Sequence, residues 1–70
     1  MSWKQNVLSS HVASVGYDEA TNDLLVEWKN GKTSAYAGVP EDLAQQVANA
    51  PSVGQMIHGL IKNNYPHRYV

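Results

Sequence analysis

The sequence has no cysteine, so its 70 residues can form neither a disulfide nor a thiolate metal site. It also has no run that approaches the roughly 20 apolar residues of a membrane span. Residues 1–10 lack the apolar segment of a signal peptide. From these absences we expect a cytoplasmic protein with no cofactor, no metal and no place in a membrane.

Charge of one sign is also scarce. Five Lys and Arg residues stand against six Asp and Glu residues, and only 16% of the chain is charged. Proteins that grip long nucleic acids usually carry a clear basic excess, because affinity comes largely from neutralising phosphates. The balance therefore disfavours a long polyanion as the ligand, although it leaves room for a local basic patch.

Residues suited to catalysis are few. The chain has no Gly-x-Ser-x-Gly elbow, and no nucleophile–base pair is recognisable. Its carboxylates fall in a polar turn at residues 18–23 and at Glu41 and Asp42, where a helix dipole explains them. No metal-ligand spacing relates the three histidines, which are His11, His58 and His67. We therefore expect no enzymatic activity.

Hydrophobic alternation predicts three strands. They are expected at residues 11–17, 24–29 and 32–39. The second strand has the clearest pattern, with Leu24, Val26 and Trp28 on one face. Asn30-Gly31 between the last two strands predicts a type I′ hairpin, which needs positive φ at both positions. Before these strands the apolar anchors are few, so we expect the first residues to be loosely held.

Two helices should follow the strands. Pro40 suits the first turn of a helix that Pro51 ends. Ser52, with Gln55 three residues later, predicts a capping box at the start of a second helix that runs to about Asn64. The predicted fold is thus β-β-β-α-α, an α+β domain in which two helices cover one face of a three-stranded antiparallel meander. The expected core consists of Leu24, Val26, Trp28, Leu43, Val47, Ile57, Leu60 and Ile61.

We expect one domain over residues 1–70, with its core within residues 7–65. A chain this short buries only about 60% of the surface that it exposes when unfolded, so its core is marginal. Small domains are usually supported by disulfides, a metal or a partner chain. Because the sequence disfavours the first two, we expect a homo-oligomer.

A candidate ligand site lies along the second helix. Ser52 and Gly54 would offer free N–H groups to an anion, and His58 and Lys62 follow at four-residue intervals on the same stripe. A protonated His58 would strengthen phosphate binding. The stripe could equally be a solvated helix face, with Ser52 a simple cap. Candidate neighbours of the site are Tyr36, Lys32 and Arg68.

Short motifs along the chain resemble the KTSC domain family. In the first half they are Val7-x-Ser-Ser-x-Val12, Val15-Gly-Tyr-Asp18 and Leu24-x-Val-x-Trp28 followed by Asn30-Gly31. In the second half they are Tyr36-x-x-Val39-Pro40, Ala50-x-Ser52-x-Gly54 and Ile61-Lys-x-x-Tyr65. The resemblance covers nearly the whole chain, with the motifs in order.

The resemblance implies a small stand-alone bacterial or phage protein. The family also occurs at the C-terminus of some lysyl-tRNA synthetases, which suggests RNA binding by association, but its function is unassigned. This sequence departs from the family at two points. A Tyr-x-Tyr pattern reads Ser34-Ala35-Tyr36, which weakens a mechanism in which two tyrosines on one strand stack successive bases, and His58 stands where Asn is common.

We therefore expect a non-enzymatic binding module for a nucleotide-type ligand, either RNA or a small nucleotide sequestered by a phage-encoded oligomer. The alternative is a protein–protein interaction module, for example a phage protein directed at a host factor. Low net charge argues against a long polyanion but not against a ligand with one or two phosphates. Small domains gain pockets most readily at subunit interfaces.

Overall fold

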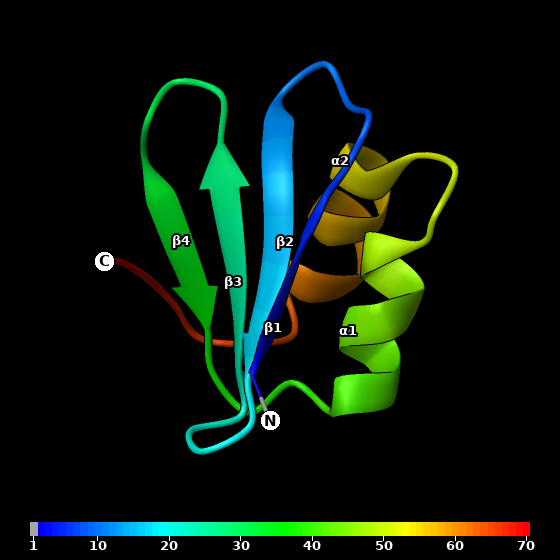
Figure 1. The fold of residues 1–70 in the computed structure, drawn as a ribbon. Coiled ribbons are helices and arrows are strands. Elements are labelled where there is room, and N and C mark those ends of the chain that lie inside the picture. The colour runs from blue at the N-terminus through cyan, green and yellow to red at the C-terminus, as the bar shows by residue number, and fades with distance from the viewer. Residues whose placement is uncertain (1) are drawn as a thin grey trace.

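A computed structural model describes residues 2–70 as an antiparallel sheet with helices on one face (Figure 1). Its strands are β1 (Trp3–Asn6), β2 (Val12–Asp18), β3 (Asp23–Trp28), β4 (Thr33–Tyr36) and β5 (His67–Tyr69). Its helices are α1 (Glu41–Ala48), α2 (Val53–Met56) and a π-helical segment, η1 (Ile57–Ile61), that continues α2. The α+β class is confirmed. The three-stranded count is wrong, because the sheet has five strands in the order β1-β2-β3-β4-β5.

Both missed strands lie at the edges of the sheet. In β1, Trp3 pairs with Tyr17, so the first residues are held rather than loose. In β5, His67 pairs with Tyr36 of β4. The two segments carry little apolar alternation, because an edge strand is bonded on one side only and exposes most of its side chains.

The hairpin between β3 and β4 is longer than the predicted type I′ turn. The Gly31 N–H donates to the Trp28 carbonyl at 3.0 Å, and the Trp28 N–H donates to the Lys32 carbonyl at 2.8 Å. Gly31 has a φ of 91°, whereas Asn30 does not have a positive φ. The prediction of positive φ at both positions is therefore wrong, and glycine alone takes the left-handed conformation.

The second helix widens into a π turn after Met56. The Lys62 N–H donates to the Ile57 carbonyl at 2.8 Å, five residues earlier, as a π-helix requires. The predicted capping box is wrong, because Ser52 makes no side-chain capping hydrogen bond. The Ser52 carbonyl instead accepts the Met56 N–H at 3.0 Å, so the backbone alone opens this helix.

The wider turn changes which residues face the sheet. Ile57 and Ile61 are buried as predicted, but Leu60 is 45% exposed and its assignment to the core is wrong. With five residues between bonded groups, Leu60 is rotated away from the face that an α-helix would give it. Trp28 and Leu43 are only partly buried and pack against the edge of the core.

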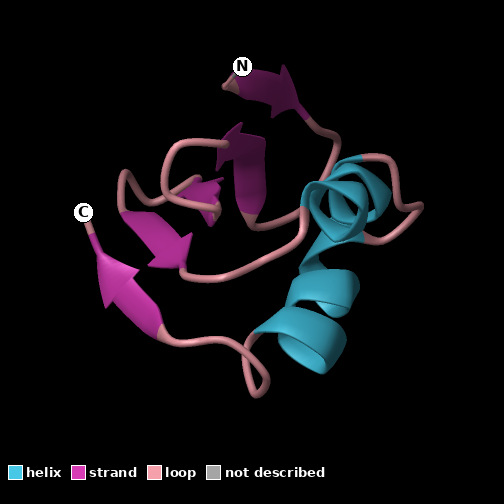
Figure 2. Cartoon of the chain, turned by 90° about the horizontal axis from the view of Figure 1, so that it is seen from below, coloured by secondary structure: helices cyan, strands magenta, loops and turns pink. Residues whose placement is uncertain are grey.

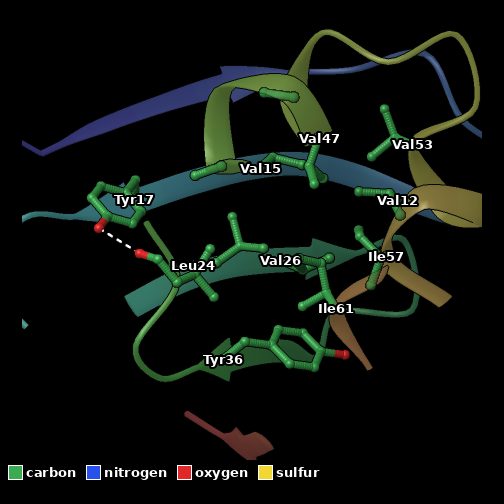
Figure 3. Packing of buried hydrophobic residues seen from close by; sticks show 13 residues of the cluster. Val12, Val15, Tyr17, Leu24, Val26, Tyr36, Val47, Val53, Ile57 and Ile61 are labelled. Atoms are coloured by element: carbon green, nitrogen blue, oxygen red, sulfur yellow. Dashed lines mark hydrogen bonds between the residues drawn. The ribbon is translucent and has the colours of Figure 1, made fainter. Parts of the chain in front are cut away.

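The core lies between the helical layer and the helix-facing side of β2 and β3. Both helices lie on the same side of the curved sheet (Figure 2), where Val15, Leu24 and Val26 belong to one cluster with Ile61 (Figure 3). All four of these side chains are 0% exposed. In the described chain, residues 2–70, no helix is long and apolar enough to cross a membrane.

Candidate functional site

A pocket of about 710 Å³ lies between the second helix and the β3–β5 end of the sheet. Its sheet wall consists of His11, Trp28, Ser34, Tyr36, His67 and Tyr69. Its helix wall consists of Gly54, Gln55, Ile57, His58, Gly59 and Lys62. This volume is within the range of about 300–1,000 Å³ that is typical of small-molecule sites.

The register of β4 and β5 builds the aromatic part of the sheet wall. Tyr36 pairs with His67, and Ser34 pairs with Tyr69, so strand alternation sends all four side chains to the helix-facing side. The His67 ring lies 5.0 Å from the Tyr36 ring and 4.7 Å from the Tyr69 ring, which it meets edge-on. Planar rings therefore line one side of the pocket.

Ser34 ties this wall to the neighbouring strand. Its Oγ accepts the indole N–H of Trp28 at 2.8 Å and lies 2.9 Å from Nε2 of His67. An indole N–H can only donate, so the hydroxyl proton of Ser34 is free to donate to Nε2 of His67. This arrangement orients Trp28 and His67 along the wall.

The contact between Ser34 and His67 also corrects the expectation that the chain has no nucleophile–base pair. The pair was not recognisable in the sequence, because strand β5 was missed and 33 residues separate the two side chains. Ser34 is 1% exposed, and its oxygen already receives the Trp28 N–H. The geometry therefore gives Ser34 a positioning role.

The helix wall supplies two exposed basic side chains to the pocket. His58 and Lys62 lie on successive turns, and both are exposed. Within residues 2–70, neither side chain has a hydrogen-bond or ion-pair partner. Gly59, beside His58, leaves open space where a Cβ would stand. The helix thus presents a lysine and a histidine across a gap from the aromatic wall.

No carboxylate of the described chain lines this pocket, although all three histidines do. The histidines do not form a metal centre, since residues 2–70 contain no group of three His, Cys, Asp or Glu side chains able to hold an ion. Burial, together with the nearby Tyr69 hydroxyl, raises the pKa of Tyr36, so its phenol remains a neutral donor. The pocket therefore favours a ligand that carries negative charge and a flat apolar part.

The structure brings together four of the predicted site residues, Tyr36, Gly54, His58 and Lys62, in this pocket. Ser52 lies outside it, beside a separate depression that Met56 and Leu60 also border. Lys32 lies near the rim, with its Nζ 5.5 Å from the centre of the Tyr69 ring.

Arg68 lies on the opposite face of the sheet and belongs to a different arrangement. Its guanidinium donates to the buried Asp23 carboxylate at 2.9 Å and forms an ion pair with it. The hydrogen bond from Arg68 holds the pKa of Asp23 below its usual range, and the same bond raises the pKa of Arg68. This pair attaches β5 to the sheet from the side that the helices do not cover.

Sequence reasoning missed several residues of the pocket. These residues are His11, Trp28, Ser34, Gln55, Gly59, His67 and Tyr69. The aromatic and basic composition of residues 65–70 is the one signal that points to part of this set, because such a tail can pack back on a sheet. Ser34 stands where the resembling family has a tyrosine, and only the structure reveals that its hydroxyl links two rings.

Comparison with known proteins places the whole chain among related domains. The sequence pattern of the KTSC domain matches residues 8–65. A protein of Tsukamurella paurometabola is 31% identical over 61 residues, which are 87% of this chain and 91% of that protein. A lysine–tRNA ligase of Trichormus variabilis is 31% identical over 58 residues, which are 83% of this chain but only 10% of the ligase.

A solved structure is also similar over its full length. The crystal structure of a KTSC domain protein from Yersinia pestis matches with a TM-score of 0.89 at 33% identity. The match covers 100% of this chain and 99% of that one. These findings confirm the resemblance that the motifs indicated.

Proposed function

This chain belongs to the KTSC domain family, and we propose that it is a non-enzymatic binding module for a nucleotide-type ligand, RNA or a small nucleotide. The observation that carries the proposal is the composition of the pocket. Three histidines and Lys62 line it together with Trp28 and two tyrosines, and no described carboxylate lines it. A nucleotide combines a flat ring with a strong anion, so it matches both features of the lining.

The two walls suit the two parts of such a ligand. Aromatic faces stack on bases of any sequence, and each stacked base contributes about 1–3 kcal/mol. Lys62 and His58 on the helix wall have no partners within residues 2–70, so they are free to bind a phosphate. The similarity to a segment of a lysine–tRNA ligase supports RNA as one form of the ligand.

The test is a calorimetric titration of the protein with nucleotides and short RNAs. Lys62→Ala should weaken binding by about 1–3 kcal/mol, as expected for loss of a charge-assisted hydrogen bond. Lys29→Ala is the matched control, because Lys29 is also an exposed lysine but does not line the pocket. Binding that is absent, or that falls equally in the two variants, would remove the helix wall from the proposal and favour a protein–protein module. Unchanged nucleotide after prolonged incubation would support the absence of catalysis.

The oligomeric state and the compartment are part of the same proposal. The exposed Leu8 and Leu60 are compatible with a homo-oligomer. The mass measured by light scattering should then exceed the mass of one chain, 7.7 kDa. A measured mass equal to that of one chain would exclude any site shared between subunits. Cytoplasm remains the expected compartment, and cell fractionation tests it.

A further inference from the structure

The positions of the basic residues determine how many phosphates the pocket can hold. The chain has five Lys and Arg residues. Lys4 pairs with Glu27 at 3.0 Å, and Arg68 pairs with Asp23 at 2.9 Å. Glu27 and Asp23 alternate along β3 with residues that face the helices, so both ion pairs lie on the opposite side of the sheet. A ligand in the pocket cannot reach either cation.

The other three lysines do not form a continuous track. Lys62 lies on the helix wall, and Lys32 lies at the rim over Tyr69. Lys29 does not line the pocket but borders a neighbouring depression, which shares His11 and Trp28 with it. Within residues 2–70, the pocket therefore has one lysine directly in its wall and one at its edge.

Resting on the proposed function, we infer that the ligand is a small nucleotide with one or two phosphates, not an RNA strand that passes through the pocket. Its base lies against the wall formed by Trp28 and Tyr69, and its phosphate meets His58 and Lys62. The pocket volume of about 710 Å³ suits a ligand of this size.

An RNA strand would need more than this pocket supplies. Each phosphate that a single strand places on a cation contributes about −0.7 to the slope of log affinity against log salt. Proteins that hold single strands use a positively charged groove that follows the backbone. Here two of the five basic residues are already ion-paired on the far face, so only three lysines remain for the phosphates of a strand on the pocket side.

The experiment compares three sets of ligands on the full chain by calorimetry. They are the four ribonucleosides, their 5′-monophosphates, and a mixed-sequence octaribonucleotide without a terminal phosphate. At least one monophosphate should bind about tenfold more tightly than its nucleoside, as a charge-assisted hydrogen bond implies. The octaribonucleotide should bind no more tightly than that monophosphate.

The variants locate the phosphate. Lys62→Ala should abolish the preference for the monophosphate over the nucleoside, whereas Lys29→Ala should preserve it. A preference that survives in Lys62→Ala would overturn the assignment of the phosphate to the helix wall. An octaribonucleotide that binds more tightly than every monophosphate would overturn the small-nucleotide inference and leave the proposed function standing. Failure of all three sets to bind would instead refute the proposed function itself.

Discussion

The buried core and the pocket lie under the same helical layer, but they are built differently. The core consists mainly of aliphatic side chains from β2, β3 and both helices, with Tyr17 and Tyr36 among them, and each is at most 5% exposed. Tyr36 and Ile57 belong to the core and also line the pocket. The pocket, at the β4–β5 end, is lined by rings and by exposed polar side chains of the helix. The helices lie closer to β1 and β2 than to β4, which leaves this end less covered (Figures 1 and 2).

The difference separates stability from recognition within a very small domain. Aliphatic burial contributes about 25 cal/mol per Å² of apolar surface removed from water, so the core supplies most of the stabilisation. The sheet wall of the pocket pairs Ser34 with Trp28 and His67, whereas His58 and Lys62 of the helix wall have no partner within residues 2–70. Substitutions in the pocket should therefore change binding more than folding.

The largest effect is expected from Ile61, which is 0% exposed, compared with its neighbour Leu60, which is 45% exposed. Ile61→Ala should lower the free energy of unfolding by about 2–5 kcal/mol, because it removes buried methylene groups and leaves a cavity. Leu60→Ala deletes a side chain of the same size and should cost under about 1 kcal/mol. Urea denaturation measures both. Equal losses would mean that Leu60 packs into the core, as an uninterrupted α-helix predicts.

This pair also shows what the sequence could reveal about the fold. The spacing of Leu24 and Val26 on one face predicted the central strand, since a strand with one buried face carries a strong apolar pattern. Nothing in the residue types indicates that the helix widens at Ile57, because an α-helix and a π-helix differ by one residue per bonded turn. The assignment of Leu60 therefore failed although the helix itself was predicted.

The same limit applies to the candidate site. The stripe of Gly54, His58 and Lys62 was predictable from helical spacing, and the structure places all three in one pocket. The opposite wall depends on β5, a three-residue edge strand whose side chains are all exposed. Its pairing with β4 is a long-range contact, and no local pattern at His67 or Tyr69 encodes it.

Substitution of the two buried tyrosines should change the free energy of unfolding by smaller amounts than Ile61→Ala does. The Tyr17 hydroxyl donates to the Val39 carbonyl at 2.6 Å inside the core (Figure 3). Burial, followed by the charge of Glu41, raises the pKa of Tyr17, so this donor keeps its proton. Tyr17→Phe leaves a buried carbonyl without its donor and should cost about 1–3 kcal/mol.

Tyr36→Phe is the matched change in the pocket. The Tyr36 side chain is 4% exposed and lines the pocket, and within residues 2–70 its hydroxyl, unlike that of Tyr17, donates to no backbone carbonyl. Tyr36→Phe should therefore lower the free energy of unfolding by less than Tyr17→Phe in the same denaturation experiment. A greater loss for Tyr36→Phe would show that the pocket wall contributes to the folding energy as strongly as the core does.

The attachment of β5 should depend on pH. The hydrogen bond from Arg68 lowers the pKa of Asp23 in the folded state, so the pair stabilises the fold above the usual aspartate pKa of about 3.9. That contribution is lost as the pH falls through the lower folded-state value. Arg68→Ala should thus lower the melting temperature at pH 7, and the difference from the wild type should shrink in acid.

Lys4→Ala provides the control for this measurement. It removes the other ion pair of the same sheet face, whose two side chains are 60% and 44% exposed. Exposed pairs contribute little, so its melting temperature should stay closer to that of the wild type at pH 7. If the difference in melting temperature between Arg68→Ala and the wild type persists unchanged at low pH, Arg68 acts through packing and not through the Asp23 carboxylate.

The smallest energetic effect, and the most direct view of the two regions, should come from the two tryptophans. Trp3 lies beside the core, where it stacks on Tyr17 at 6.1 Å and donates to Glu41 at 3.1 Å. Trp28 lies in the pocket wall. Trp3→Phe and Trp28→Phe therefore each leave one fluorescent reporter, one for the pocket and one for the region beside the core.

Iodide should distinguish these reporters, because it is an anion and Lys62 carries a positive charge in the pocket wall. Quenching should be stronger for Trp28 than for Trp3, whose indole N–H is held by a carboxylate that repels the ion. A nucleoside monophosphate should then protect Trp28 from iodide and leave Trp3 unchanged, since only one of them lines the pocket. Equal protection of both would place the bound anion outside the pocket or indicate a change of the whole fold, and the contrast between core and pocket would not hold.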